Sequence, residues 1–190
     1  MRSMISTVLR GREAQSLIEA ALLLPVLLVL TFNAANMGYM FWAYLNMATA
    51  SRQGAEYSIQ GVETIPESNL PTADAVKTLV YAGFGTSAAG GSSTPIRVCA
   101  KSSGLSTTFT GAQQIPLCTT YGTGGSFPTD PNCTTGAIPI CPDPEASYGL
   151  ILNRVDVQYT VTPLIDGAAF NLILPAPITF HRFIYMRNIG

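Results

Sequence analysis

The residues of this sequence that could do chemistry are four cysteines, one histidine and a few scattered acids. The cysteines all lie in the second half of the chain, at Cys99, Cys118, Cys133 and Cys141. In an exported protein, four cysteines in a loop-rich segment favour two disulfides, and three pairings are then possible. We favour Cys99–Cys118 and Cys133–Cys141, because both bonds close short loops within one region.

A zinc site is the alternative use of the same cysteines. Zinc ligands commonly occur in closely spaced pairs such as C-x-x-C, whereas this sequence has no such pair and a single histidine, His181. His181 belongs to an alternating segment near the C-terminus, where a satisfied or surface histidine is expected. We therefore predict no metal and no other cofactor.

The sequence also lacks the motifs that assemble a catalytic site. It contains no G-x-S-x-G, Walker A, G-x-G-x-x-G or H-E-x-x-H pattern. Asp143 and Glu145 are close together, but they lie in a proline-rich segment, where a solvated pair is expected. No nucleophile, base and orienting group can be assigned. We predict that the protein is not an enzyme.

The distribution of charge directs attention to a membrane. Charged residues make up 11% of the chain and hydrophobic residues 47%, against about 25% charged in a typical soluble domain. The net charge is −1 and no Lys/Arg cluster is present, so no nucleic-acid partner is expected. Residues 20–51 contain no Asp, Glu, Lys or Arg, and three arginines precede them, at Arg2, Arg10 and Arg12.

Residues 17 to about 41 satisfy the requirement for a transmembrane helix, which needs about 20 mostly apolar residues. The basic N-terminal flank predicts a cytoplasmic N-terminus and an extracytoplasmic C-terminal part. A signal peptide cleaved near residues 34–35 is the competing interpretation. We favour retention, because the apolar character continues to Leu45 and because Glu19 lies where the apolar segment begins.

These observations divide the chain into three parts. Residues 1–14 form a cytoplasmic leader, residues 15–60 a long transmembrane and projecting helix, and residues 61–190 an extracytoplasmic α+β domain. Such a helix is longer than the ~30 Å hydrocarbon core. Its own domain or neighbouring subunits must therefore cover an apolar stripe with helical spacing, formed by Met37, Met40, Phe41, Tyr44, Leu45 and Ala48.

Within the C-terminal part, the pattern predicts a short helix over 72–82 and strands over 95–100, 155–162 and 178–189. In the strand 155–162, valines and a tyrosine alternate with polar residues, as in a strand with one buried face. Residues 170–174 are a short apolar run between the last two strands, and residues 101–149 read as a long surface excursion. A long helix followed by a small antiparallel sheet with a disulfide-containing loop region is an α+β fold.

The most specific pattern is the run AQSLIEAALLLP at residues 14–25. It resembles the N-terminus of TadE-like proteins, the pseudopilins of tight-adherence (Flp-type) pilus systems. The matching positions are Ala14, Glu19 and Pro25, and the resemblance extends to residue 55. Ala14 replaces the glycine usual before the processing site, and Ala20 replaces the aromatic residue usual after the glutamate.

The resemblance implies that a prepilin peptidase cuts between Ala14 and Gln15, which makes Glu19 the fifth mature residue. It also implies that Glu19 pairs with the N-terminal amine of a neighbouring subunit during assembly. The residues themselves allow a local role as well, because Ser16 and Glu19 have the S-x-x-E spacing of a helix capping box. Pro25 is expected to bend the helix.

The predicted function is structural. We expect a minor pilin-like, TadE-type subunit that takes part in assembly of a tight-adherence pilus or related secretion apparatus. Its expected location is the bacterial inner (cytoplasmic) membrane, and its expected partners are other pilin-like subunits, the pilus assembly machinery and the prepilin peptidase. The alternative is a signal-anchored extracytoplasmic module for ligand binding or adhesion, with residues 101–149 as its contact region.

Overall fold

The computed structural model describes residues 2–60, 70–84, 94–106, 115–130, 140–141, 150–165, 167 and 177–189, with side chains over 15–187 of these ranges. The chain divides into two compact units. One comprises Met1–Phe41 with Thr162–Pro177, and the other comprises Trp42–Val161 with Ile178–Gly190. Elements of the second unit carry most of the fold described below.

The long helix α1 spans Arg2–Ser58 and contributes to both units. The sequence predicts a helix that begins at residue 15, whereas α1 begins at Arg2. The leader is therefore helical as well. The reason is that extending an existing helix adds one hydrogen bond for each residue fixed, without the unfavourable nucleation step. Pro25 lies inside α1 without interrupting it.

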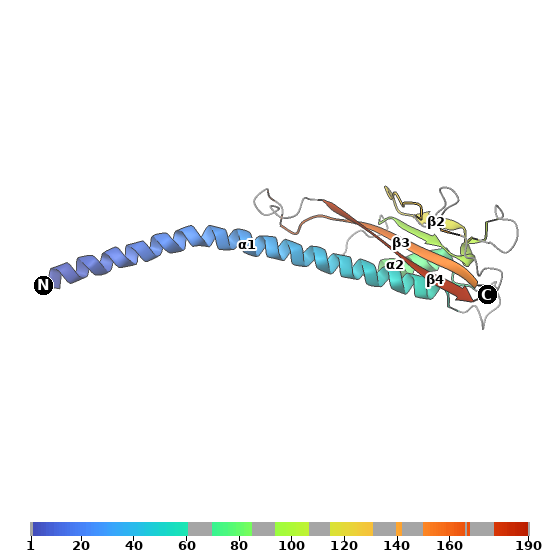
Figure 1. Ribbon diagram of the computed structural model, residues 1–190, viewed down its shortest axis with the longest axis horizontal. Helices are drawn as coiled ribbons and strands as arrows, with labels where there is room; N and C mark the ends of the chain where they lie inside the picture. The colour runs from blue at the N-terminus through green and yellow to red at the C-terminus, as the bar shows by residue number, and fades with distance from the viewer. Residues whose placement is uncertain are drawn as a thin grey trace. The chain divides into compact units, whose positions relative to one another are not determined.

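A four-stranded antiparallel sheet forms the centre of the second unit (Figure 1). Its strands are β1 (Ile96–Cys99), β2 (Cys118–Tyr121), β3 (Leu150–Val161) and β4 (Ile178–Ile189), in the order β2-β1-β3-β4. β3 and β4 pair without a bulge, from Leu150 opposite Ile189 to Val161 opposite Ile178. A long N-terminal helix followed by this sheet confirms the predicted α+β fold.

One face of the sheet packs against helices. Val155, Val157 and Tyr159 of β3 are buried. A Cβ atom added to Gly54 of α1 would lie 2.4 Å from Val80 Cγ2 and 3.6 Å from Val155 Cγ1. The glycine therefore permits a three-way contact of α1 with the sheet and with helix α2, which spans Ala73–Phe84. The apolar core of this unit lies between these elements.

A threonine caps the start of helix α2. The Oγ1 atom of Thr72 accepts a hydrogen bond from the N–H of Ala75 at 3.2 Å, which satisfies one of the free donors of the first turn. Val76, Val80 and Phe84 are buried, and the Phe84 ring lies 5.6 Å from that of Tyr159. The predicted helix over 72–82 is confirmed and continues two residues further.

The predicted apolar stripe of α1 is covered only in part: Met40 is buried, and Tyr44 and Ala48 are half-buried. Met37, Phe41 and Leu45 are 54%, 63% and 47% exposed. The other buried positions of α1 include Ala43, Met47, Ala50 and Ala55. Small side chains let backbones approach closely: a Cβ on Gly83 would lie 2.9 Å from that of Ala50. Close packing therefore favours a face made mostly of alanines with Met40 and Met47, and Met37, Phe41 and Leu45 stay outside.

The prediction that residues 101–149 form only a surface excursion is wrong in part. The segment contains β2 and a 3-10 turn, η3 (Lys101–Ser103). Ile115 and Ile140 are buried with Cys99 in a cluster against which Leu152 and Tyr185 pack. Residues of this segment thus cover the second face of the sheet. The expected apolar run at 170–174 lies outside the described residues.

Candidate functional site

The first functional feature is the N-terminal half of α1. Among the described residues, one helix, Gln15–Ser58, is long and apolar enough to cross a membrane. Every residue from Gln15 to Leu28 is exposed, and Leu17, Leu22 and Leu27 are 60–70% exposed. Removing apolar surface from water contributes about 25 cal/mol per Å². A leucine-rich surface on all sides of a helix suits a lipid environment, and this fits a single-pass membrane protein.

Glu19 lies within this apolar surface and is exposed. Its Oε1 atom accepts a hydrogen bond from Gln15 Nε2, one turn earlier, at 3.2 Å. The capping-box interpretation of Ser16 and Glu19 is wrong for this chain, because α1 begins at Arg2 and both residues lie in its interior. The pairing of Glu19 with a neighbour's amine stays a prediction, as does cleavage between Ala14 and Gln15.

Asn36 marks a change of environment along α1. Its Nδ2 donates to the Ile165 carbonyl at 3.0 Å, and its Oδ1 accepts from the Ile165 N–H at 2.9 Å. This reciprocal pair holds the segment after β3 against α1 within the first unit. Asn36 is 2% exposed. From this turn onward, other parts of the protein cover one side of the helix. The part that is exposed on most sides is therefore Leu17–Phe32, which is roughly 24 Å long.

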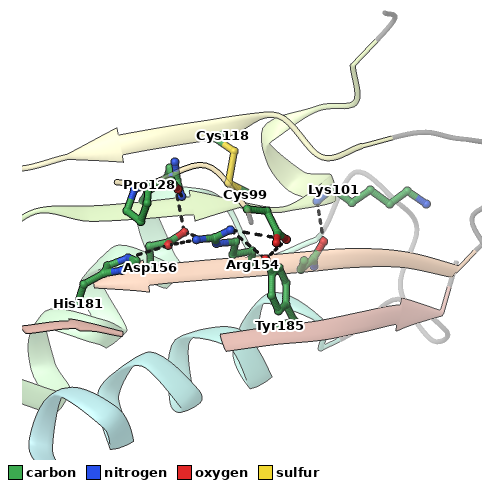
Figure 2. The surroundings of a disulfide bond; sticks show 11 residues. Cys99, Lys101, Cys118, Pro128, Arg154, Asp156, His181 and Tyr185 are labelled. Atoms are coloured by element: carbon green, nitrogen blue, oxygen red, sulfur yellow. Dashed lines mark hydrogen bonds and ion pairs between the residues drawn. A yellow bond between two sulfur atoms is a disulfide. The ribbon is translucent and has the colours of Figure 1, made fainter. Parts of the chain in front are cut away.

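The second feature is a buried charged cluster on the face of the sheet opposite the helices (Figure 2). Asp156 is its centre and, like Arg154, is 0% exposed. Arg97, directly opposite on β1, donates from Nε to Asp156 Oδ2 at 3.1 Å. Arg154 donates from Nε to Oδ2 at 2.8 Å and from Nη2 to Oδ1 at 2.6 Å. The Nε2 atom of His181 lies 3.0 Å from Oδ1.

Asp130 balances the second positive charge of the cluster. The Tyr185 hydroxyl donates to Asp130 Oδ2 and accepts a hydrogen bond from Arg154 Nη1 at 2.9 Å. Arg154 Nη1 also lies 3.9 Å from Asp130 Oδ2. Burial, followed by the hydrogen bond to Asp130, raises the pKa of the Tyr185 phenol. Tyr185 therefore remains a neutral hydrogen-bonding link between the two charged groups.

Aromatic rings enclose the two guanidinium groups. The Arg154 guanidinium lies 4.7 Å from the ring centre of Phe183 and 5.2 Å from that of Tyr185. The Arg97 guanidinium lies 5.1 Å from the ring of Phe127, and its Nη2 donates to the Pro128 carbonyl at 3.0 Å. Cation–π contacts stabilise such groups by about 0.5–1 kcal/mol at exposed sites and by about 2 kcal/mol when water is excluded. The cluster thereby fastens residues 127–130 onto the sheet.

The disulfide Cys99–Cys118 joins β1 to β2 next to this cluster (Figure 2). The two cysteines are directly opposite in the strand register, and the pairing that we favoured is confirmed. Cys141 is disulfide-bonded as well, while Cys133, Asp143 and Glu145 lie outside the described residues. Within the described ranges, no group of three or more His, Cys, Asp and Glu side chains is arranged to hold a metal ion.

Comparison with known proteins identifies the N-terminal segment. Residues 14–56 match the family model described as TadE-like protein. This segment is TadE-like. The match confirms the resemblance that Ala14, Glu19 and Pro25 carry, and it covers the exposed apolar part of α1 together with most of its buried part. No curated protein and no solved structure matches the chain.

Sequence reasoning missed the charged cluster. The alternation over 155–162 predicts one solvent-facing polar row, yet Asp156 is fully buried. A signal was present, because Arg154 and Asp156 are two residues apart on one strand and must share a face. Nothing in the sequence indicates that Asp130 and Tyr185 complete the arrangement, since both are brought in by distant segments.

Proposed function

We propose that the protein is a pilin-like, TadE-type subunit that takes part in assembly of a tight-adherence pilus or related secretion apparatus, and that it performs no catalytic step. One observation carries this proposal: the residues that match the TadE-like family form an apolar helix, and much of that helix is not covered by the rest of the protein. A pilin-like subunit needs such a helix in the membrane before assembly and against other subunits afterwards.

Two surfaces of α1 support this use. The segment from Leu17 to Leu28 is exposed all round, as required of a helix surrounded by lipid. Further along, Met37, Phe41 and Leu45 remain exposed on one side while the alanine-rich side is buried. Large apolar side chains exposed in a row at helical spacing suit a neighbouring helix rather than water.

The proposed orientation follows from charge and sulfur chemistry. Arg2, Arg10 and Arg12 precede the charge-free stretch, which favours a cytoplasmic N-terminus. The disulfide Cys99–Cys118 is consistent with an oxidising compartment for the rest of the chain. In bacteria, this corresponds to an inner-membrane anchor with an extracytoplasmic domain.

Glu19 is the residue that we propose to act in assembly. A carboxylate near the start of a membrane helix is unfavourable to bury alone and ordinarily has a partner. Here Glu19 contacts the side-chain amide of Gln15. This amide is neutral, so the contact does not compensate the charge of the carboxylate. The N-terminal amine of a neighbouring processed subunit would supply the opposite charge.

N-terminal sequencing of the mature protein, combined with Glu19→Gln, tests the proposal. We expect a mature N-terminus at Gln15 in both the wild type and E19Q. We also expect E19Q to lose most cross-linking to other pilin-like subunits, although it keeps the side-chain volume and a hydrogen-bond acceptor for Gln15. The control Glu56→Gln, exposed further along α1, should assemble normally.

A start at Arg12 would also support processing, whereas two other N-termini would contradict it. A start at Met1 indicates a simple signal anchor, and a start near Asn36 indicates a cleaved signal peptide. Normal assembly of E19Q would remove the role of the carboxylate.

A further inference from the structure

The outer edge of β4 is open. In the part of the chain that the structure describes, β4 pairs only with β3 and ends the sheet. It is 12 residues long, contains no proline and pairs with β3 without a bulge. In an antiparallel strand, every second residue directs its N–H and C=O away from the paired neighbour. No strand in the described part of the chain pairs with this side of β4.

Edges of this kind are normally protected. Proteins shorten their edge strands, bulge them, or place proline or charged residues there, because an open edge pairs with other chains. The charged residues of β4 are Arg182 and Arg187. A long, regular edge with so little protection is therefore a candidate for strand addition.

An apolar groove lies beside this edge within the same unit. Its volume is about 550 Å³. Leu45, Ala48, Thr49 and Arg52 of α1 and Arg182, Ile184 and Met186 of β4 line it. Arg182, Ile184 and Met186 alternate along β4 and so share one face of the strand. The groove could receive every second side chain of a strand added to β4.

The charges at the groove select the partner. Arg52 forms an ion pair with Glu56 at 2.8 Å, whereas Arg182 is exposed and has no carboxylate partner among the described residues. β4 itself carries two arginines and no acid. Pairing two copies of β4 would place arginines from both chains along one edge with no compensating carboxylate. An acidic partner strand is favoured over a second copy.

We propose that the open edge of β4 binds an extended segment of a partner subunit by strand addition, with apolar side chains in the groove and a carboxylate against Arg182. In this mode of recognition the main-chain hydrogen bonds supply affinity, and pockets for alternate side chains supply specificity. In this partner segment, one acidic and two apolar side chains follow one another at alternate positions, so that all three lie on the same face of the strand. This inference does not depend on pilus membership.

A synthetic peptide tests the proposal on the full-length protein in detergent micelles. The nine-residue peptide TETVTVTET places two glutamates and two valines on one face and reads the same in both directions. We expect it to bind with a salt-sensitive affinity and to slow hydrogen exchange at alternate amides of β4, while the amides of β2 are unaffected. Fluorescence anisotropy and exchange mass spectrometry measure the two effects.

Matched charge reversals locate the contact. Arg182→Glu should weaken binding of TETVTVTET about tenfold. Arg187→Glu, on the same strand but the other face and also exposed, should change it less than twofold. The peptide TKTVTVTKT should bind R182E better than it binds the wild type, which excludes simple misfolding of the variant.

Three results would overturn the proposal. The first is the absence of peptide binding to the wild type. The second is slow exchange of all β4 amides in the free protein, which would show that the chain covers its own edge. The third is concentration-dependent self-association that protects β4, which would assign the edge to a second copy.

Discussion

At the scale of single residues, Asp156 determines how the second face of the sheet is packed. Its two carboxylate oxygens accept hydrogen bonds from Arg97 and Arg154. The Nε2 atom of His181 lies 3.0 Å from one of these oxygens. Removing one partner of a buried ion pair leaves the other charge buried and uncompensated, which costs about 3–5 kcal/mol. In this cluster two guanidinium groups would lose their shared acceptor.

We therefore predict that Asp156→Asn strongly destabilises the second unit. The amide keeps the volume of the carboxylate but cannot compensate either arginine, and the free energy of unfolding should fall by about 3–5 kcal/mol. Urea denaturation followed by circular dichroism measures the change. The control Glu56→Gln breaks an exposed ion pair with Arg52 and should cost less than about 1 kcal/mol. Similar losses in both variants would mean that the cluster does not support the fold.

Tyr185 makes a pH-dependent contribution. Burial and the bond to Asp130 raise its pKa above the usual 10.0, so the neutral phenol is favoured in the folded protein. Stability from this group is complete below pH 10 and is lost as the pH rises through the higher folded pKa. The unfolding free energy of the wild type should thus fall relative to that of Tyr185→Phe as the pH rises from 10 to 12. A difference independent of pH would contradict this account.

At the scale of elements, α1 combines a tightly packed face and an open face. Gly54 lies where α1, α2 and β3 meet, while a Cβ on Gly38 would have no atom within 4 Å. The same residue type thus occupies two environments, and the same substitution distinguishes them.

We predict that Gly54→Ala lowers the unfolding free energy by about 1–3 kcal/mol, because the added methyl group overlaps Val80 in a packed core. Gly38→Ala should leave the folded protein unchanged or stabilise it by up to about 1 kcal/mol through helix propensity. Thermal unfolding of both variants measures the contrast. Equal destabilisation would place Gly38 in a packed contact. A loss of subunit cross-linking in G38A alone would indicate that a neighbouring helix approaches α1 at Gly38.

At the scale of the whole molecule, the uneven distribution of charge determines the expected topology. A reporter enzyme active only outside the cytoplasm, fused after Gly190, should be active. Replacing Arg2, Arg10 and Arg12 together with glutamate should reduce its activity, because cytoplasmic loops are selected by their Lys and Arg content. The control Arg52→Gln, beyond the charge-free stretch, should leave activity unchanged. An inactive reporter on stably inserted wild-type protein would reverse the proposed orientation.

Much of this architecture was predictable because it is encoded locally. The charge-free run over 20–51, the capping threonine at Thr72 and the alternation in 178–189 are properties of neighbouring residues, and α1, α2 and β4 follow from them. The TadE-like motif is likewise a short contiguous pattern, and the family match over residues 14–56 confirmed it. Helical and strand periodicities report which residues share a face, and they do so without knowledge of the rest of the chain.

Only the tertiary structure decided which face each element buries. The sequence predicts an apolar stripe through Phe41, but that residue is exposed and α1 buries a neighbouring face rich in alanine. The close approach of α2 and β3 leaves no room for a larger residue at Ala50 or Gly54. Asp156 is buried rather than solvated, because Arg97, 59 residues away in sequence, and the segment at Pro128 close over it. A buried charge is stable only when distant groups supply its counter-charge and hydrogen bonds. Those groups are brought together by folding, so local sequence patterns do not reveal them.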